Sequence, residues 1–222
     1  MGRRERKRQR TRQSLIDCAL RLFQEKGYDQ TTLAEVTAAA DVSTKTFFNY
    51  FASKDEVLFA HQSARFDAGI RIIDQHTPGE KMVDVLVRAM EHMLSDAVDN
   101  DLSSGLAAGR LPLLMAVPSV QAAALRRYFL AETQLAQALH RAYPDTLDWP
   151  TAATVVGALM GAVLGASVAS LQQGETSDQT RAAAQRAIQI AVSGLHTAED
   201  APDPGRTPQP DGGLRPQPTE SK

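Results

Sequence analysis

The stretch Thr32–Lys54, TLAEVTAAADVSTKTFFNYFASK, decides the fold of the N-terminal region. Glu35 follows Thr32 by three residues, which is the spacing of a capping box, and it predicts the start of a short helix. Asp41 tolerates left-handed backbone geometry better than most residues and favours a tight turn after that helix. Ser43 then caps a second short helix. Two short helices joined by a tight turn are typical of a DNA-binding helix-turn-helix.

The second helix, residues 43–50, has a core face and an open face. Phe47 and Phe51 are one turn apart, and we expect both to point into the core. The open face carries side chains of the kinds that read base edges in the major groove, namely Asn49 for adenine, Phe48 for thymine methyl groups and Lys45 for guanine or phosphate. The spacing therefore predicts a recognition helix.

A wider pattern of fixed offsets surrounds this helix. It comprises Gly27-Tyr28-x-x-Thr31-Thr32, then Val42-Ser43-x-x-Thr46-Phe47, then Tyr50-Phe51-x-x-Lys54-x-x-Val57-Leu58. This pattern resembles the signature of the TetR/AcrR family of transcriptional regulators over roughly the first quarter of the chain. The resemblance and the open face together predict one DNA-contacting set: Thr32, Ser43, Thr44, Lys45, Thr46, Phe48, Asn49, Tyr50 and Lys54.

Within that set, Thr32, Tyr50 and Lys54 lie at helix ends, where hydroxyl and ammonium groups suit phosphate. By resemblance, these positions contact the DNA backbone. The sequence departs from the family pattern twice, with Asp41 where glycine is usual and Phe48 where tyrosine is usual. The second departure removes a hydroxyl that would otherwise touch the backbone.

Charge is distributed unevenly along the 222 residues, whose formal net charge is only −2. Nine basic and three acidic residues precede Gly27, so the rest of the chain carries an acidic excess. Such asymmetry indicates a polyanionic partner, either nucleic acid or an anionic membrane surface. We expect residues 1–9 to form a disordered basic arm. It either lies along the DNA or only adds nonspecific attraction.

Residues typical of helix starts and helix ends recur through the remainder of the chain, which predicts an all-α fold. Residues 10–57 are expected to form a three-helix DNA-binding domain, with a first helix from about Arg10. Residues 58–197 are expected to form a larger helical domain for effector binding and dimerisation. Capping spacings at Ser53/Glu56, just before the boundary between these domains, and at Thr77/Glu80 predict two further helix starts. Residues 198–222 are rich in proline and polar residues and are expected to be disordered.

Residues 152–171 contain no charged residue, which raises the alternative of a membrane span. The segment is mostly alanine, glycine, serine and threonine, so its transfer into lipid is weakly favourable. Small residues recur along one stripe that suits close helix approach: Ala153, Gly157, Gly161, Gly165 and Ala169. We therefore expect no membrane insertion but a homodimer interface, in the place where the resembling family forms a four-helix dimer bundle. A twofold dimer predicts a palindromic operator.

By resemblance, the middle helices enclose a pocket for a small-molecule effector. The expected lining residues are apolar side chains together with one histidine and one arginine: Phe66, Ile70, Met90, His92, Met93, Arg110, Leu114, Phe129 and Met160. Each of the apolar residues could equally be ordinary core. The leading hypothesis is a repressor that the effector releases from DNA. The alternative is a constitutive or protein-regulated DNA binder with a filled core, and a cavity of a few hundred cubic ångströms would separate the two.

Enzymatic function is not expected. The five histidines lack metal-ligand spacing, and the sequence has no phosphate-binding glycine loop and no nucleophile elbow. We accordingly predict no catalytic residue, no metal site and no cofactor. A single cysteine, Cys18, fits a reducing compartment, and the charged start of the chain is unlike a secretory signal. The expected location is the bacterial cytoplasm.

Overall fold

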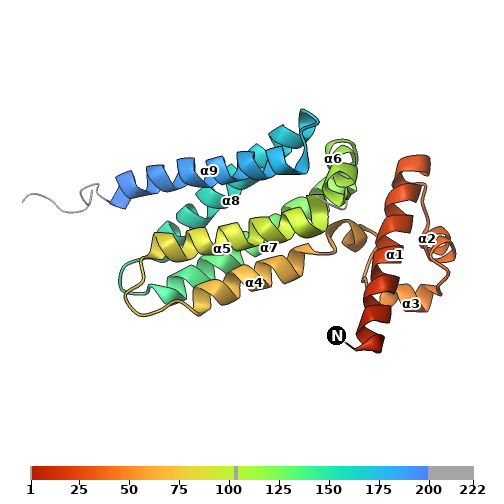
Figure 1. Cartoon of the computed structure of the whole chain (residues 1–222), viewed down its shortest axis with the longest axis horizontal. Helices are drawn as coiled ribbons and strands as arrows, with labels where there is room; N and C mark the ends of the chain where they lie inside the picture. Colours follow the sequence, from red (N-terminus) through yellow and green to blue (C-terminus); the bar gives the residue numbers. More distant parts are fainter. Residues whose placement is uncertain (1, 103–104, 200–222) are drawn as a thin grey trace, which may run out of the picture.

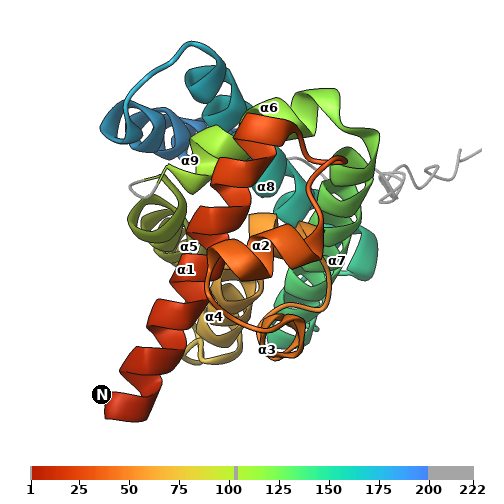
Figure 2. The ribbon, with the colours of Figure 1, turned by 90° about the vertical axis from the view of Figure 1, so that its right-hand side faces the viewer.

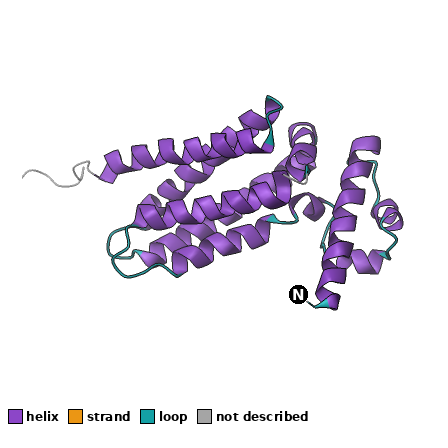
Figure 3. Ribbon diagram, viewed as in Figure 1, coloured by secondary structure: helices purple, strands orange, loops and turns teal. Residues whose placement is uncertain are grey.

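The computed structural model describes residues 2–102 and 105–199. All regular secondary structure in these residues is helical, as the sequence predicted (Figure 3). In chain order the elements are α1 (Arg3–Lys26), α2 (Leu33–Ala39), α3 (Thr44–Phe48), the 3-10 helix η1 (Asp55–Phe59), α4 (Gln62–Asp74), α5 (Met82–Ala97), the π-helical turn η2 (Val98–Leu102), α6 (Leu106–Ala116), α7 (Pro118–Ala142), α8 (Trp149–Gln172) and α9 (Ser177–Glu199). The expected disordered tail lies outside the described residues from position 200 onwards.

Two hydrophobic cores divide the molecule. The smaller core is built mainly from α1, α2, α3 and η1, and it also includes Leu106 of α6 and Val120 and Ala123 of α7. The larger core joins α4, α5, α7, α8 and α9. Figure 1 shows the corresponding shape, with α1–α3 at one end, the long bundle at the other and α6 beside the junction. The end formed by α1–α3 therefore packs directly on α6 and α7.

Helix α1 begins at Arg3, so the expected start at Arg10 is wrong. Residues 3–9 continue the helix and do not form the disordered arm that composition predicted. Arginine, lysine, glutamine and glutamate are good helix formers, and neither glycine nor proline interrupts the chain between Arg3 and Lys26. The basic residues consequently extend as a rigid helix, exposed on all sides before Thr11.

The segment between α3 and α4 also differs from prediction. Glu56 does not cap a long helix from Ser53; its carboxylate accepts a hydrogen bond from the Ala52 N–H, and a short 3-10 helix follows. The long helix begins only at Gln62. Glu56 thus finds a partner one residue earlier than expected, and the chain forms a separate element, η1, whose residues Val57, Leu58 and Phe59 belong to the smaller core.

The predicted capping interaction at Thr77 forms without starting a helix. The Glu80 carboxylate accepts a hydrogen bond from the Thr77 N–H at 3.1 Å. Gly79, however, adopts a positive φ of 85°, which ends any helical path there, and α5 starts at Met82. The prediction of a left-handed turn at Asp41 is confirmed by its φ of 52°.

Candidate nucleic-acid interface and ligand cavity

Helices α2 and α3 are held by side-chain caps. The Thr32 Oγ1 accepts a hydrogen bond from the Glu35 N–H at 3.3 Å, while the Glu35 carboxylate accepts one from the Thr32 N–H at 2.8 Å, completing the predicted capping box. At the start of α3, the Ser43 Oγ accepts a hydrogen bond from the Thr46 N–H at 3.1 Å. Three of the expected DNA contacts, Thr32, Ser43 and Thr46, therefore also serve the local fold.

The side chains of α3 separate as its spacing predicted. Phe47 is fully buried and Phe51 nearly so, and their rings lie 5.5 Å apart. Thr44, Lys45 and Asn49 are exposed, and Phe48 keeps 53% of its surface exposed although it is a large apolar residue. Figure 2 looks onto this end of the molecule, where α1, α2 and α3 lie in front of the bundle. This open face can accept a partner.

Lys54 has a structural role that the sequence did not predict. Its Nζ donates to the carbonyl oxygens of Tyr28 at 2.6 Å and Thr31 at 3.0 Å, and it lies 4.1 Å from the centre of the Tyr28 ring. Burial lowers the pKa of Lys54. The ammonium thus ties the loop between α1 and α2 to the residues after α3, and any phosphate contact would have to share it.

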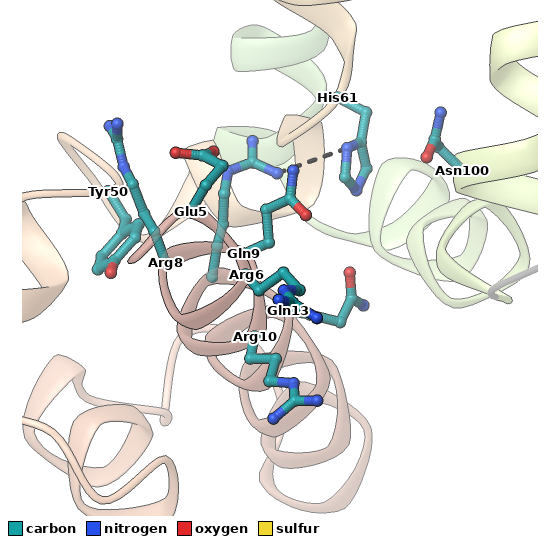
Figure 4. Close-up of a pocket in the computed structure, with 10 residues that line it drawn as sticks. Glu5, Arg6, Arg8, Gln9, Arg10, Gln13, Tyr50, His61 and Asn100 are labelled. Atoms are coloured by element: carbon teal, nitrogen blue, oxygen red, sulfur yellow. Dashed lines mark hydrogen bonds between the residues drawn. The ribbon is translucent and has the colours of Figure 1, made fainter. Parts of the chain in front are cut away.

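A second polar surface lies along the exposed start of α1. It forms a cleft of about 690 Å³ whose lining is mainly polar and basic: Glu5, Arg6, Arg8, Gln9, Arg10, Arg12, Gln13, Tyr50, His61 and Asn100. In Figure 4, Arg8 and Tyr50 lie toward one side of α1 and His61 and Asn100 toward the other. Tyr50, an expected backbone contact, is partly buried and borders this cleft. The cleft joins the recognition region to the basic helix.

Arg12 anchors α1 to the segment that leads into α4. Its Nη2 donates to the Ala60 carbonyl, its Nη1 lies 3.4 Å from the His61 Nδ1, and its guanidinium lies 5.3 Å from the centre of the Phe51 ring. Burial, followed by the charge of Arg12, lowers the pKa of His61. Sequence reasoning assigned Arg12 only to a basic run, because its partners are about fifty residues away.

A cavity of about 760 Å³ opens among α4, α5, α6, α7 and α8. Six of the residues predicted for an effector pocket line it: Phe66, Met90, Met93, Arg110, Leu114 and Met160. Ile70, His92 and Phe129 do not. Ile70 packs against the larger core, His92 is exposed on α5, and Phe129 is 56% exposed on α7. Helical periodicity does not tell which of two neighbouring faces borders a cavity, so these three expectations are corrected.

Sequence reasoning found Arg110 but missed two other charged residues of the cavity. The lining includes Arg65 and Asp101, and the Arg65 Nη2 lies 3.0 Å from the Asp101 Oδ2. One signal was available for Arg65, which shares the buried i, i+4, i+8 face of α4 with Gly69 and Ile73. A basic residue on an apolar helix face marks a buried ionic contact. Asp101 follows α5 in the π-helical turn and carries no comparable signal.

Three comparisons with known proteins bear on the family. Residues 15–61 match the sequence family described as "Bacterial regulatory proteins, tetR family". The chain is 34% identical to the HTH-type transcriptional regulator TcmR of Streptomyces glaucescens over 139 residues, which span 61% of this chain and 62% of TcmR. Residues 15–61 are thus similar to the N-terminal region of TetR-family proteins. Members of this family are DNA-binding transcriptional regulators. The match covers less than two thirds of TcmR.

Solved structures of TetR-family proteins share the fold. A protein from Mesorhizobium loti assigned to this family superposes with a TM-score of 0.58 at 16% identity, covering 89% of this chain and 98% of that one. The SmeT–triclosan complex gives a TM-score of 0.57 at 19% identity, covering 90% and 98%. At these identities the likeness concerns architecture, and it places a helix-turn-helix domain before a helical carboxyl domain, as the sequence predicted.

The stripe of small residues on α8 packs within the subunit along only part of its length. A Cβ on Gly157 would meet the Glu132 Oε1 of α7 at 2.6 Å, and Ala153 packs against the larger core. A Cβ on Gly161 would meet only the Tyr128 hydroxyl, at 3.8 Å, and Gly161 is exposed. A Cβ on Gly165 would meet nothing within 4 Å, and Ala169 is exposed. The first half of the predicted stripe thus packs within the subunit, and its second half remains open.

Helix α8 as a whole has little cover in the single chain. It is 24 residues long, and only 28% of its most apolar 18-residue stretch is buried. By length and composition alone it could therefore cross a membrane. Its neighbour α9 exposes Ile190 to 75%. Exposed apolar surface of this kind is typical of sites that contact another protein or a membrane.

Proposed function

We propose that this chain is a TetR-type transcriptional regulator that binds specific duplex DNA through α3. The observation that carries the proposal is the open face of α3, where Thr44, Lys45, Phe48 and Asn49 are exposed beside a buried Phe47. Lysine and asparagine hydrogen-bond base edges, and phenylalanine contacts thymine methyl groups. The basic start of α1 supplies sequence-independent attraction to phosphate. The remaining members of the DNA-contacting set would contact the DNA backbone and fix the orientation of the protein on the duplex: Thr32, Ser43, Thr46, Tyr50 and Lys54.

The second part of the proposal is a homodimer formed through α8 and α9. The exposed Gly161, Gly165 and Ala169 on α8 and Ile190 on α9 support it, since small residues permit close approach and an exposed isoleucine favours burial. A lipid bilayer could also cover the exposed side of α8. The similarity of residues 15–61 to DNA-binding regulators favours a protein partner instead. A twofold dimer presents two copies of α3, which calls for a palindromic operator.

The third part is control by a small molecule, with the protein acting as a repressor in the bacterial cytoplasm. The cavity of about 760 Å³ supports this reading over the alternative of a constitutive or protein-regulated binder, because a chain used only for dimerisation needs no such space. The related fold of SmeT has been solved with triclosan. The effector must bind the DNA-incompetent state more tightly, and DNA must then weaken effector binding by the same factor.

Selection of bound fragments from random duplex DNA tests the first two parts together. The proposal expects recovered sites with two inverted half-sites, centred about one helical turn of roughly 34–36 Å or a multiple of it apart. Recovery of fragments without a common motif would leave only nonspecific attraction. A motif without inverted symmetry would retain the recognition helix but remove the twofold dimer.

A further inference from the structure

Charged side chains meet at one place in a cavity whose lining is otherwise mostly apolar. Arg65 of α4, Asp101 of η2 and Arg110 of α6 all line it. The Asp101 Oδ2 lies 3.0 Å from the Arg65 Nη2 and 3.5 Å from the Arg110 Nη2. All three side chains are at least largely buried, with 9%, 2% and 13% exposed for Arg65, Asp101 and Arg110. The lining therefore holds two guanidinium groups and one carboxylate.

A second carboxylate, that of Asp96, approaches only one of the two arginines. Its Oδ2 accepts a hydrogen bond from the Arg65 Nε at 3.0 Å, and Asp96 lies outside the cavity lining. Arg65 is thus bracketed by two acidic groups, whereas Arg110 shares Asp101 at the longer distance. Burial lowers the pKa of Arg110, which means that its surroundings disfavour the charge. An anion in the cavity beside Arg110 would relieve that cost.

Arg110 also contacts η1, the element that follows the recognition helix α3 in the chain. Its Nη1 donates to the Leu58 carbonyl at 2.9 Å, and its guanidinium lies 5.6 Å from the centre of the Phe59 ring. Both residues belong to η1, and Phe59 also lines the cavity. One guanidinium therefore connects the cavity to the element between α3 and α4.

We propose that the effector is an amphiphilic anion, with an apolar body in the methionine- and leucine-rich part of the cavity and an acidic group paired with Arg110. This proposal rests on the proposed ligand control and specifies its chemistry. A carboxylate or sulfonate presents two oxygens side by side and suits the fork of a guanidinium. The acidic group competes with the Leu58 carbonyl for Arg110, so effector binding releases a hydrogen bond of η1 and changes the support of α3.

A matched pair of fluorescent probes tests the charge preference. 1-Anilinonaphthalene-8-sulfonate carries an acidic group, and N-phenyl-1-naphthylamine has the same ring system without it. Arg110→Met should weaken binding of the sulfonate roughly tenfold or more and change binding of the neutral amine less than about threefold. Arg127→Met is the control, since Arg127 also lies over the Phe59 ring, at 5.1 Å, but does not line the cavity. Equal losses for both probes in Arg110→Met would overturn the proposal.

The unmodified chain provides a second test that does not depend on how the variants fold. 2-Naphthoate should displace bound 1-anilinonaphthalene-8-sulfonate at a concentration roughly tenfold lower than 2-naphthamide does. Equal displacement by the acid and the amide would contradict an anionic effector. Both measurements are made without DNA, so a failure of duplex binding, measured separately by fluorescence anisotropy, would remove the proposed regulator and leave the probe result standing.

Saturating 1-anilinonaphthalene-8-sulfonate should also weaken duplex binding by the wild-type chain. It should leave duplex binding by the Arg110→Met variant nearly unchanged. If the probe weakens duplex binding equally in both chains, its effect does not pass through the hydrogen bond from Arg110 to Leu58. That result would overturn the proposed coupling between the cavity and α3. Folding of each variant is checked by circular dichroism and thermal melting before these comparisons.

Discussion

Individual residues of the recognition region divide into those that hold the fold and those that remain open to DNA. Lys54 belongs to the first group because its ammonium bonds two carbonyls and lies over Tyr28. Lys45 and Asn49 belong to the second, because both are exposed on or beside α3. The family pattern alone treats Lys54 as a phosphate contact. The structure adds a stabilising role that can be measured without DNA.

Lys54→Ala should lower the free energy of unfolding by about 1–3 kcal/mol, since two hydrogen bonds to a charged group are lost. Lys45→Ala is the matched control and should change it by less than about 0.5 kcal/mol, as expected for an exposed residue. Urea unfolding followed by circular dichroism measures both. A Lys54→Ala variant as stable as the wild type would show that the ammonium does not support the loop between α1 and α2.

Asn49→Ala should alter which sequence is preferred. If the amide pairs with a base, discrimination at that base falls by about 1–3 kcal/mol, while binding to random duplex is nearly unchanged. Competition binding with a selected site and its single-base variants measures this difference. Equal loss on every duplex would assign Asn49 to the phosphate backbone instead.

At the scale of elements, the capping box of α2 makes stability depend on pH. The hydrogen bond from Lys26, followed by those from Thr32, lowers the pKa of Glu35 to about 2. An unfolded glutamate titrates near about 4.3, so the carboxylate stabilises the folded chain above that pH, and this contribution is lost as the pH falls toward 2. The Lys26 Nζ lies 2.6 Å from the Glu35 Oε1.

Glu35→Gln tests this dependence while keeping a residue that can complete the box. Between pH 5 and pH 2, roughly the interval set by the two pKa values, the variant should lose less stability than the wild type. Glu80, whose pKa is also lowered to about 2, by Arg88 first, remains in both proteins and cancels in the comparison. Parallel pH profiles of unfolding for the two chains would contradict the assignment.

The proposed dimer surface can be tested at Gly165, where the chain itself offers free space. A Cβ there would meet nothing within 4 Å, so Gly165→Leu should leave the subunit folded but obstruct close approach of a second copy. Sedimentation should show loss of the dimer at micromolar concentration. Ser95→Leu, which adds leucine at an exposed position of α5, should remain dimeric. A dimeric Gly165→Leu variant would exclude this part of α8 from the interface.

The helices themselves were largely predictable because local signals agree with one another. Thr32 with Glu35, Ser43 and the positive φ at Asp41 fix the helix-turn-helix through contacts between near neighbours in sequence. Prediction was wrong at Glu56, because its carboxylate accepts a hydrogen bond from Ala52 and not from Ser53. It was also wrong at Thr77, where the capping contact forms but no helix follows directly. Local spacing does not decide between such alternatives.

At the scale of the whole molecule, the cavity and the junction were only partly predictable. Five apolar pocket residues were found because apolar positions recur on inward helix faces, and Arg110 was found as a polar residue of the predicted pocket region. Arg65 and Asp101, in contrast, are 36 positions apart in sequence, and nothing local pairs them. The bond from Arg110 to the Leu58 carbonyl likewise spans 52 positions. These long-range polar contacts couple the two cores, and they carry the ligand control that we propose.

The central claim is that α3 enters the DNA groove, assisted by the basic start of α1. Its most direct test is fluorescence anisotropy of the purified chain with a selected duplex at increasing salt. The logarithm of the association constant should fall linearly with the logarithm of salt concentration, by about 0.9 per phosphate contact, and random duplex should bind at least roughly a thousandfold more weakly. Equal binding to both duplexes, or no salt-dependent binding to either, would contradict the account.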